Sequence, residues 1–189
     1  LCKPLIGPDT AVISFLNGVD SEARLEAVLG PDTVVGGVAR IPSNISAPGV
    51  IQHNAMNGFV AGEPNGRASA RLAALEELGR KAVLDVSISA DIELELWRKF
   101  LVLTPASGMS CLTRLPMGRI RETPPSWRLI EEAMDELIAV GQAEGVGLGE
   151  ADKQIGVRGI RDMMPPTWRG SLVLDLEAGR RLEVEWLHG

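Results

Sequence analysis

The stretch ADIELELWRKFLVL places a lysine on an apolar helix face. At about 100° per residue, one face of the helix expected over residues 91–104 carries Ile92, Leu96, Phe100 and Leu103. Lys99 projects into the middle of that face. Burial disfavours the charged form of an amine, which moves the pKa of a lysine toward the range useful for proton transfer. Lys99 is therefore a candidate proton-transfer group.

Two structural roles account for the same lysine. Lys99 can form a salt bridge with Glu95, which lies one turn earlier on the helix. Its long stem can also cover apolar surface while the ammonium group stays in water. The pattern alone leaves these alternatives open.

The last part of the chain repeats the pattern with a carboxylate. The segment SLVLDLEAGRRLEVEWLHG reads as part of a helix from about residue 167 to the end, with one face formed by Leu172, Leu176 and Leu187. Glu183 falls on that face, where burial would raise the pKa of a glutamate. Alternatively, Glu183 lies exposed beyond a kink at Gly179, or it pairs with a buried cation.

Asn17 is a third candidate because of its place between two elements. It follows an apolar run expected to be a strand over residues 11–16 and precedes the helix SEARLEAVL, with Asp20 as its cap and Gly30 as its stop. Ligands in open α/β sheets bind outside the carboxyl ends of the strands. An Asn–Gly turn accounts for the residue equally well. The sequence pattern alone gives no reason to consider Ser171 a functional residue.

Several classes of site and partner are disfavoured by composition and motif. The 189 residues carry a formal net charge of −6 and 45% apolar residues, so nothing favours nucleic acid and the core can be substantial. No apolar run approaches a membrane span of roughly 18 residues, and no signal peptide is evident. His53 and His188 lack metal-ligand spacing, and GVGLGE follows a helix and opens no βαβ unit. Two distant cysteines, Cys2 and Cys111, favour a reducing cytoplasm.

The pattern of elements changes near residue 90 and predicts two domains, residues 1–90 and 91–189. The first alternates β-like runs at 34–41, 49–55, 58–63 and 82–88 with helices, the later one over 67–81. The connections among the first three runs are too short for crossover helices, so we expect antiparallel pairing. The second domain is expected to be all helical. Its clearest helix is predicted from Ser126 to about Glu144, with Gly145 as its stop.

In this order, the segments LNGVDSEARLEAVLG, VVGGVARI, PGVIQH, DIELELWRKF and SLVLDLEAGRRLEVEWLHG resemble the ketopantoate reductase family, the 2-dehydropantoate 2-reductases. The motif ELWRK is the most specific of them. The resemblance implies part of an N-terminal Rossmann-type domain that binds NADPH, followed by a helical domain like the C-terminal domain of 6-phosphogluconate dehydrogenase, with the site in the cleft between them. The implied reaction is the NADPH-dependent reduction of a 2-oxoacid, with 2-dehydropantoate to pantoate in pantothenate biosynthesis as the leading choice. A homodimer is a candidate assembly.

The resemblance also assigns roles to single residues. It implies that Lys99 is the general acid, that Asn17 lines the cofactor and substrate cleft, and that Ser171 and Glu183 bind the substrate. The best-known members carry asparagines where this chain has Leu103 and Ser107. Ser107 is expected on the substrate side, whereas a leucine cannot bind a substrate hydroxyl.

The family's glycine-rich cofactor loop does not occur in residues 1–189. The first residues read as the tail of a helix before a strand, so we expect an upstream part of the domain. Two alternatives to the leading interpretation stay open. One is a non-catalytic helical module for dimerisation with a degenerate site, and the other is a related reductase for a different 2-oxoacid.

Overall fold

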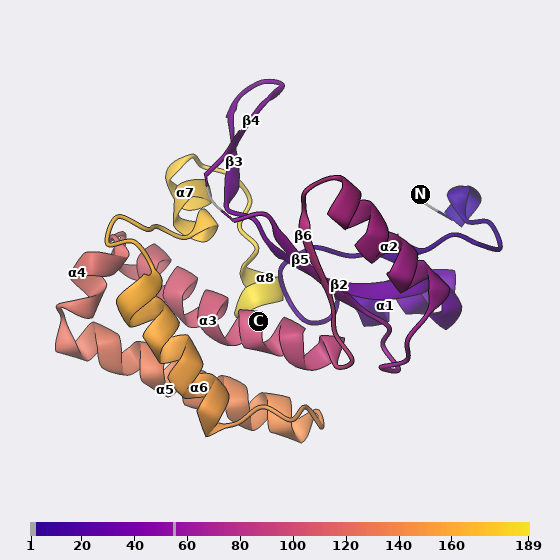
Figure 1. Ribbon diagram of the computed structural model, residues 1–189. Coiled ribbons are helices and arrows are strands. Elements are labelled where there is room, and N and C mark those ends of the chain that lie inside the picture. The colour runs from indigo at the N-terminus through magenta and orange to yellow at the C-terminus, as the bar shows by residue number, and fades with distance from the viewer. Residues whose placement is uncertain (1–2, 55) are drawn as a thin grey trace. The chain divides into compact units, whose positions relative to one another are not determined.

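The structure is a computed structural model that describes residues 3–54 and 56–189. The chain divides into two compact units, Leu1–Leu96 and Trp97–Gly189. The first unit combines strands and helices, and the described part of the second is helical (Figure 1). This agrees with the predicted order of an α/β part followed by an all-α part. Helix α3, Ile92–Thr113, begins in the first unit and continues into the second.

The first unit is built on a four-stranded sheet of order β1-β2-β5-β6. Strands β1 and β2 pair in parallel, β2 and β5 antiparallel, and β5 and β6 again in parallel. The elements of this unit are η1 Lys3–Leu5, β1 Val12–Ile13, α1 Ser21–Leu29, η2 Pro31–Thr33, β2 Val34–Arg40, β3 Ser43–Ala47, β4 Val50–His53, β5 Gly58–Gly62, α2 Ala70–Lys81 and β6 Asp85–Ile88. The predicted antiparallel pairing is confirmed for β2 and β5.

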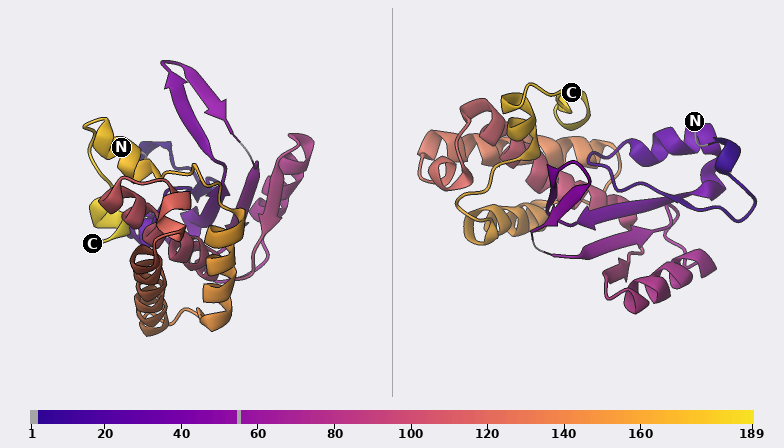
Figure 2. Two further views of the ribbon diagram at one scale, coloured as in Figure 1. Left: turned by 90° about the vertical axis from the view of Figure 1, so that its left-hand side faces the viewer. Right: turned by 90° about the horizontal axis from the view of Figure 1, so that it is seen from above.

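Helices α1 and α2 each connect a parallel strand pair and lie on opposite sides of the sheet (Figure 2). Successive side chains of a strand point to opposite faces, so β2 and β5 supply both cores. One core contains Val38, Val60, Ile92 and Leu96. The other contains Val35, Ala61 and Leu72, with Ile13, Leu75 and Ile88 packed against it. The apolar run VVGGVAR is therefore buried on both faces over most of its length.

A pair of glycines lets the start of α3 approach the sheet. Gly36 and Gly62 are cross-strand partners in β2 and β5. A Cβ atom added to either residue would lie 2.8 Å from a side-chain atom of Ile92. Ile92 is 3% exposed and fills the space that these two absent side chains leave. The close approach fixes the first turn of α3 on the sheet of this unit.

Strands β3 and β4 form a separate two-stranded hairpin that projects from the sheet (Figures 1 and 2). Every residue of both strands is exposed, including the cross-strand pair Ile45 and Ile51 at 77% and 73%. Strand β3 was not predicted, and the run at 49–55 pairs with it rather than with β2. Position 55 lies outside the described residues. The stretch 41–62 contains no Asp, Glu, Lys or Arg.

The second unit packs several helices around the later part of α3. They are α4 Met117–Arg121, α5 Pro124–Ala143, α6 Glu150–Arg158, the π-helical turn η3 Gly159–Met163, α7 Ser171–Glu177 and α8 Val184–Leu187. Its most deeply buried side chains are Leu101, Met117, Ile120, Ile130, Met134, Ile160 and Val173. Helix α5 packs one face into this core, because Ile130 and Met134 are fully buried and Leu137 and Ile138 are half-buried.

Three predicted features of these helices are corrected by the structure. Helix α3 does not end near residue 104 as expected, because it runs on to Thr113 although Pro105 offers no amide hydrogen to the carbonyl of Leu101. Helix α5 begins at Pro124 rather than Ser126, because proline suits the first helical position. The single final helix is wrong, since α7 and α8 are separate helices.

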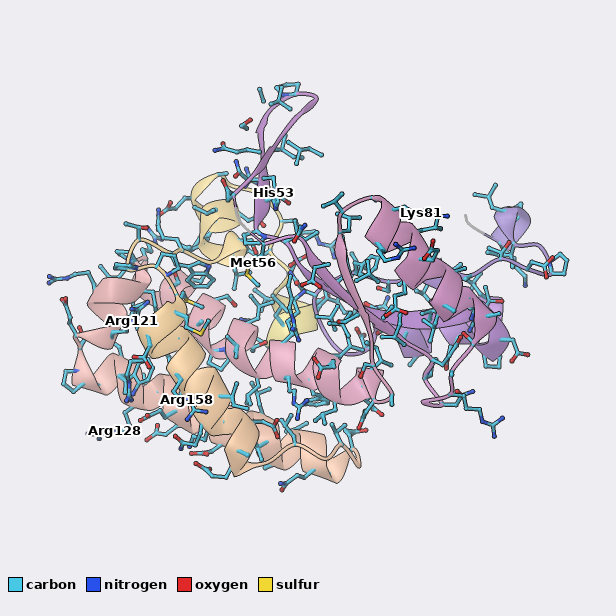
Figure 3. All side chains as sticks on the ribbon, in the orientation of Figure 1. His53, Met56, Lys81, Arg121, Arg128 and Arg158 are labelled. Atoms are coloured by element: carbon cyan, nitrogen blue, oxygen red, sulfur yellow. The ribbon has the colours of Figure 1, made fainter. Side chains whose placement is uncertain are left out.

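Arg121 ties the short helix α4 to the end of the helical segment α6–η3 (Figure 3). Its guanidinium donates to the carbonyl of Arg161 at 2.9 Å and to the carbonyl of Met164. These carbonyls lie at a helix end, where intrahelical partners are missing. No helix in the described part of the chain is long and apolar enough to cross a membrane.

Candidate functional site

Lys99 lies half-buried on α3, three residues into the second unit. The sequence predicts an apolar helix face that includes Lys99. On that face, Ile92 and Leu96 are buried, and Phe100 and Leu103 are half-buried. A lysine at such a position keeps its stem among apolar side chains and presents its amine at the edge of the packed region. The apolar residues predicted for this face are thus buried or half-buried, while the role of Lys99 stays a prediction.

The helix backbone on either side of Lys99 is held by ion pairs. Arg98 donates from Nε to Oδ1 of Asp152 at 2.7 Å, and Asp152 is 9% exposed. Oδ2 of Asp152 accepts the amide hydrogen of Gly149 at 3.0 Å, which caps the start of α6. Within the first unit, Arg40 donates to Glu95 at 2.7 Å. A charge-assisted pair with one buried partner fixes a helix more firmly than a fully exposed pair does.

Asp152 is the residue of this region that the sequence analysis missed. It anchors Arg98, the immediate neighbour of Lys99, to the N-terminus of α6. The available signal was the sequence GEAD, in which an acidic residue three positions after Gly149 can close a capping arrangement. Its link to Arg98 spans 54 positions and carries no local signal.

Ser107 faces the interior of the second unit. It is 1% exposed, and its hydroxyl donates to the carbonyl of Thr104 at 3.3 Å. Leu103, one turn after Lys99, is half-buried. A substrate hydroxyl would therefore meet a leucine at one position, and at the other a serine hydroxyl that is already bonded.

Ser171 is the exposed first residue of α7 and follows a tightly packed glycine. A Cβ atom added to Gly170 would lie 2.9 Å from Cβ and 3.0 Å from Cα of Ser107. The preceding segment is held from another side, because Met117 donates its amide hydrogen to the carbonyl of Trp168 at 3.0 Å. Ser107 on α3 and Ser171 on α7, both predicted from the resemblance, are thus brought close together.

Glu183 does not occupy a buried helix face, which corrects the sequence-based expectation. It is exposed and precedes the first residue of α8. Helix α7 ends earlier because Gly179 adopts a left-handed conformation with φ +65°, and Arg180 donates its amide hydrogen to the carbonyl of Asp175 at 2.8 Å. This arrangement closes a helix and turns the chain away. The alternative of an exposed Glu183 beyond Gly179 is the one that holds.

Helix α8 rests on α3 through its last residues. Leu187 is 3% exposed, and Cε1 of His188 lies 2.7 Å from the position that a Cβ of Gly108 would take. The ring edge is covered there although the residue as a whole is exposed, and this burial lowers the pKa of His188. A glycine inside a helix costs about 1 kcal/mol relative to alanine. The close approach of His188 is a packing reason for Gly108.

Asn17 lies in the first unit, half-buried in the bend after β1. Gly18 follows with φ +103°, so the predicted Asn–Gly turn is confirmed. Asp20 occupies the cap position of α1 as predicted, but its side chain makes no capping hydrogen bond. Behind the turn, burial raises the pKa of Glu22.

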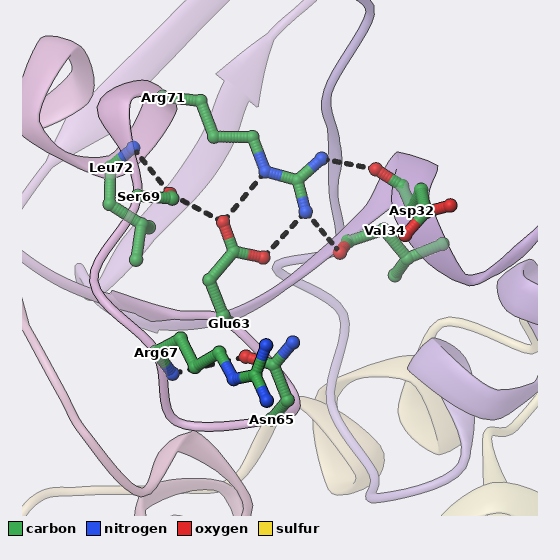
Figure 4. Close-up of polar contacts among 8 residues, drawn as sticks. All are labelled: Asp32, Val34, Glu63, Asn65, Arg67, Ser69, Arg71 and Leu72. Atoms are coloured by element: carbon green, nitrogen blue, oxygen red, sulfur yellow. Dashed lines mark hydrogen bonds and ion pairs between the residues drawn. The ribbon is translucent and has the colours of Figure 1, made fainter.

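A polar network in the first unit joins the end of β5 to the starts of β2 and α2 (Figure 4). Glu63, 6% exposed, accepts hydrogen bonds from Nε and Nη2 of Arg71 at 2.7 and 2.5 Å, and from Ser69 at 2.5 Å. Arg71 also donates to the carbonyl of Val34 at 3.1 Å and to that of Asp32. The guanidinium of Arg71 and the hydroxyl of Ser69 hold the pKa of Glu63 below its usual value.

Metal ligation finds no support among the described residues, where no group of three or more His, Cys, Asp or Glu side chains gathers. Cys111 is a free thiol, and Cys2 lies outside the described residues. A pocket of about 340 Å³ between α2 and β6 is lined by charged residues such as Glu76 and Arg80 and contains none of the predicted site residues.

Comparison with known proteins decides the family. Residues 91–189 match the sequence model described as "Ketopantoate reductase PanE/ApbA C terminal", and residues 1–66 match "Ketopantoate reductase PanE/ApbA". The chain belongs to the ketopantoate reductase family. The family resemblance inferred from the sequence is thereby confirmed, with matches in both units.

Individual relatives are similar to this protein over nearly the whole chain. The chain is 32% identical over 190 residues to "Uncharacterized oxidoreductase YkpB" of Bacillus subtilis, covering 99% of this chain and 62% of that protein. It is 28% identical to a 2-dehydropantoate 2-reductase of Halobacterium salinarum, with coverage of 94% and 58%. The crystal structure of 2-dehydropantoate 2-reductase from Geobacter metallireducens superposes with a TM-score of 0.90 at 26% identity, covering 99% and 62%. The chain thus spans about three fifths of these relatives.

Proposed function

We propose that this chain supplies the substrate-side groups of an NADPH-dependent reductase that converts a 2-oxoacid to a 2-hydroxyacid, most simply 2-dehydropantoate to pantoate. The observation that carries the proposal is Lys99. It is half-buried on α3 inside the ELWRK motif, and the neighbouring Arg98 is fixed to the buried carboxylate of Asp152. A rigid helix that presents an amine at the edge of an apolar face suits a group that must meet a developing charge.

The chemistry of the reaction defines what Lys99 has to do. When bound, the cofactor supplies a hydride to the C2 carbonyl carbon, and the carbonyl π electrons move to oxygen. Lys99 donates a proton, or a strong hydrogen bond, to that oxygen, so that the product is an alcohol. General acid assistance of this kind contributes about 10²–10⁴ in rate.

Other residues enter the proposal as binding groups. Ser171, exposed at the first turn of α7, and Glu183, exposed before α8, bind polar groups of the substrate. Ser107 would join them only if its hydroxyl left the carbonyl of Thr104. Asn17 lies in the other unit, and its part in binding substrate and cofactor rests on the family resemblance alone.

The cofactor is matched by the described residues only in part. Residues 1–189 contain no G-x-G-x-x-G, the sequence whose backbone amides hold a dinucleotide pyrophosphate at a helix N-terminus. The half-buried Asn17, beside a glycine at φ +103°, is the group of this chain that would face the nicotinamide end. The relatives named 2-dehydropantoate 2-reductase carry the reaction and not the cofactor in their names, so NADPH comes from the family resemblance.

One observation favours a second candidate substrate. Leu103 is half-buried one turn after Lys99, and the hydroxyl of Ser107 is already bonded within the helix. Both positions are asparagine in the best-known members of the family. An apolar group at 103 suits a methyl group rather than a hydroxyl, so a related reductase for a 2-oxoacid without the 4-hydroxyl is the second candidate.

The test compares the Lys99→Ala and Lys81→Ala variants of the intact protein. Lys81 is an exposed lysine of α2 that pairs with Glu77 at 3.4 Å, so its loss should leave turnover intact. Lys99→Ala should lower kcat/KM for 2-dehydropantoate by about 10²–10⁴, with little change in the affinity for NADPH.

Equal turnover in the two variants would remove Lys99 from the chemistry, whereas no turnover in the wild type would favour the non-catalytic dimerisation module. A homodimer belongs to the proposal in either case, and sedimentation velocity measures it. A loss confined to the affinity for NADPH would place Lys99 on the cofactor instead.

A further inference from the structure

Two close contacts meet at one point of α3. Gly170 approaches Ser107 so closely that an added Cβ would lie 2.9 Å from the serine Cβ and 3.0 Å from its Cα. At the next residue, Gly108, an added Cβ would lie 2.7 Å from Cε1 of His188. We refer to Ser107 and Gly108 together as the 107–108 platform. Gly170, just before α7, and His188, just after α8, pack against this platform.

The first contact determines where Ser171 lies. The segment before it is held by the start of α4, because the amides of Met117 and Gly118 donate to the carbonyls of Trp168 and Pro166 at 3.0 and 2.9 Å. Gly170 then packs on the platform, and Ser171 follows as the first residue of α7. Since backbone neighbours cannot swing aside as a flexible side-chain end can, the position of Ser171 depends on the small size of residues 107 and 170.

The second contact determines where Glu183 lies. Helix α8 has four residues, which is too short to be stable without tertiary packing. Its anchors are the buried Leu187 and the His188 ring on Gly108. The carbonyl of Glu183 accepts the amide hydrogens of Trp186 and Leu187, both at 3.2 Å, so any displacement of the anchored turn carries Glu183 with it.

We propose that the 107–108 platform is a positioning element that sets Ser171 and Glu183 at fixed places along the helix that carries Lys99. The proposal rests on the proposed function, because it assigns the two carried residues to the substrate. It also accounts for serine at 107. The Ser107 hydroxyl turns inward to the carbonyl of Thr104, and its Cβ is the surface on which Gly170 rests.

The experiment adds one methyl group at each contact and at a matched glycine. Gly170→Ala and Gly108→Ala introduce the two collisions. Gly159→Ala is the control, because Gly159 has φ −56° and no described atom within 4 Å of an added Cβ. In the intact protein, Gly170→Ala meets the backbone of Ser107 and should lower kcat/KM for the 2-oxoacid by about 10–100-fold, mainly through KM. Gly108→Ala meets only the end of the His188 ring, which can move, so its loss should be smaller, about 3–10-fold. The control should stay within twofold of wild type.

Gly108→Ala separates positioning from general stability. Alanine favours a helix more than glycine does, so the melting temperature should stay equal or rise while kcat/KM falls. His188→Ala should also raise KM, and adding Gly108→Ala to it should have no further effect, because the methyl group then meets no ring. If the effects of His188→Ala and Gly108→Ala on KM instead multiply in the double variant, the contact between the two residues is not the cause.

A nuclear Overhauser contact between His188 Hε1 and the Hα protons of Gly108 tests the platform without any turnover assay. It should be present in wild type and lost in Gly108→Ala, with His53, the other histidine, as internal reference. Its absence in wild type overturns the platform, as would unchanged KM in both glycine variants of an enzyme that Lys99→Ala inactivates. An inert Lys99→Ala with the contact present would instead overturn the proposed function.

Discussion

Because of the polar network around Glu63, we predict that replacing one carboxylate oxygen of this residue by an amide nitrogen lowers the free energy of unfolding strongly. Glu63→Gln keeps the shape of the side chain and removes its charge. The carboxylate accepts three hydrogen bonds, two of them from Arg71, and its side chain is 7% exposed while that of Arg71 is 30% exposed. Hydrogen bonds to charged groups each contribute roughly 1.5–3 kcal/mol. Because glutamine retains part of the bonding and water reaches Arg71, we expect a loss of about 2 kcal/mol.

The matched control is Glu77→Gln on helix α2. Glu77 forms ion pairs with Arg80 at 2.5 Å and Lys81 at 3.4 Å, but its side chain is 45% exposed and that of Arg80 is 72% exposed. Exposed pairs of this kind contribute about 0.3–0.5 kcal/mol. Urea unfolding followed by circular dichroism gives both free energies. At about 2–4 °C per kcal/mol for a chain of this size, Glu63→Gln should melt about 4–8 °C lower.

The pH dependence of the difference supplies a second measurement. The hydrogen bonds from Arg71 keep the folded-state pKa of Glu63 below its unfolded value, so the unfolded chain binds the proton more readily. The stabilisation is therefore complete above the unfolded pKa, about 4.3, and is lost as the pH falls through the folded value. Wild type and Glu63→Gln should converge below about pH 4. Equal losses for Glu63→Gln and Glu77→Gln at pH 7 would refute this reasoning.

Two further predictions concern ligands. Because Leu103 offers the substrate hydroxyl no partner, at a cost of about 1–3 kcal/mol, wild type should favour 2-dehydropantoate over its deoxy analogue by little or not at all. Leu103→Asn should shift the ratio of kcat/KM toward 2-dehydropantoate by roughly 5–150-fold, and a strong wild-type preference that Leu103→Asn leaves unchanged would show that position 103 does not read the hydroxyl. The 189-residue chain without a glycine-rich loop should not bind NADPH with useful affinity, and a micromolar Kd by calorimetry would mean that the cofactor site has been misplaced.

Local signals in the sequence predicted the elements well where one residue type dictates the backbone. Gly145, at φ +89°, ends α5 where predicted, and Gly30 ends α1. The segment of β2 is apolar at successive positions, which predicts a strand buried on both faces, and β2 is such a strand. These features depend on neighbours within a few positions, which a single sequence displays directly.

Features that depend on distant partners could not be read in this way. Strand β3 has no apolar alternation of its own and exists through pairing with β4. In the sequence, the helical spacing of apolar residues continues past Gly179 to Glu183. In the structure, Gly179 adopts a left-handed conformation, so α7 ends before Glu183. Likewise, the link from Arg98 to Asp152 and the approach of His188 to Gly108 join segments far apart in sequence. For Lys99, the helical spacing and the family motif together carried the prediction.

The exposed hairpin β3–β4 has a consequence for limited proteolysis. An isolated two-stranded hairpin is only marginally stable in water, and no side chain of this one is buried, so its backbone should open far more often than the sheet. Trypsin requires lysine or arginine at the cleaved bond, and residues 41–62 offer neither. The segment that opens most readily would therefore escape trypsin. Elastase, whose pocket takes small side chains, should cut there first.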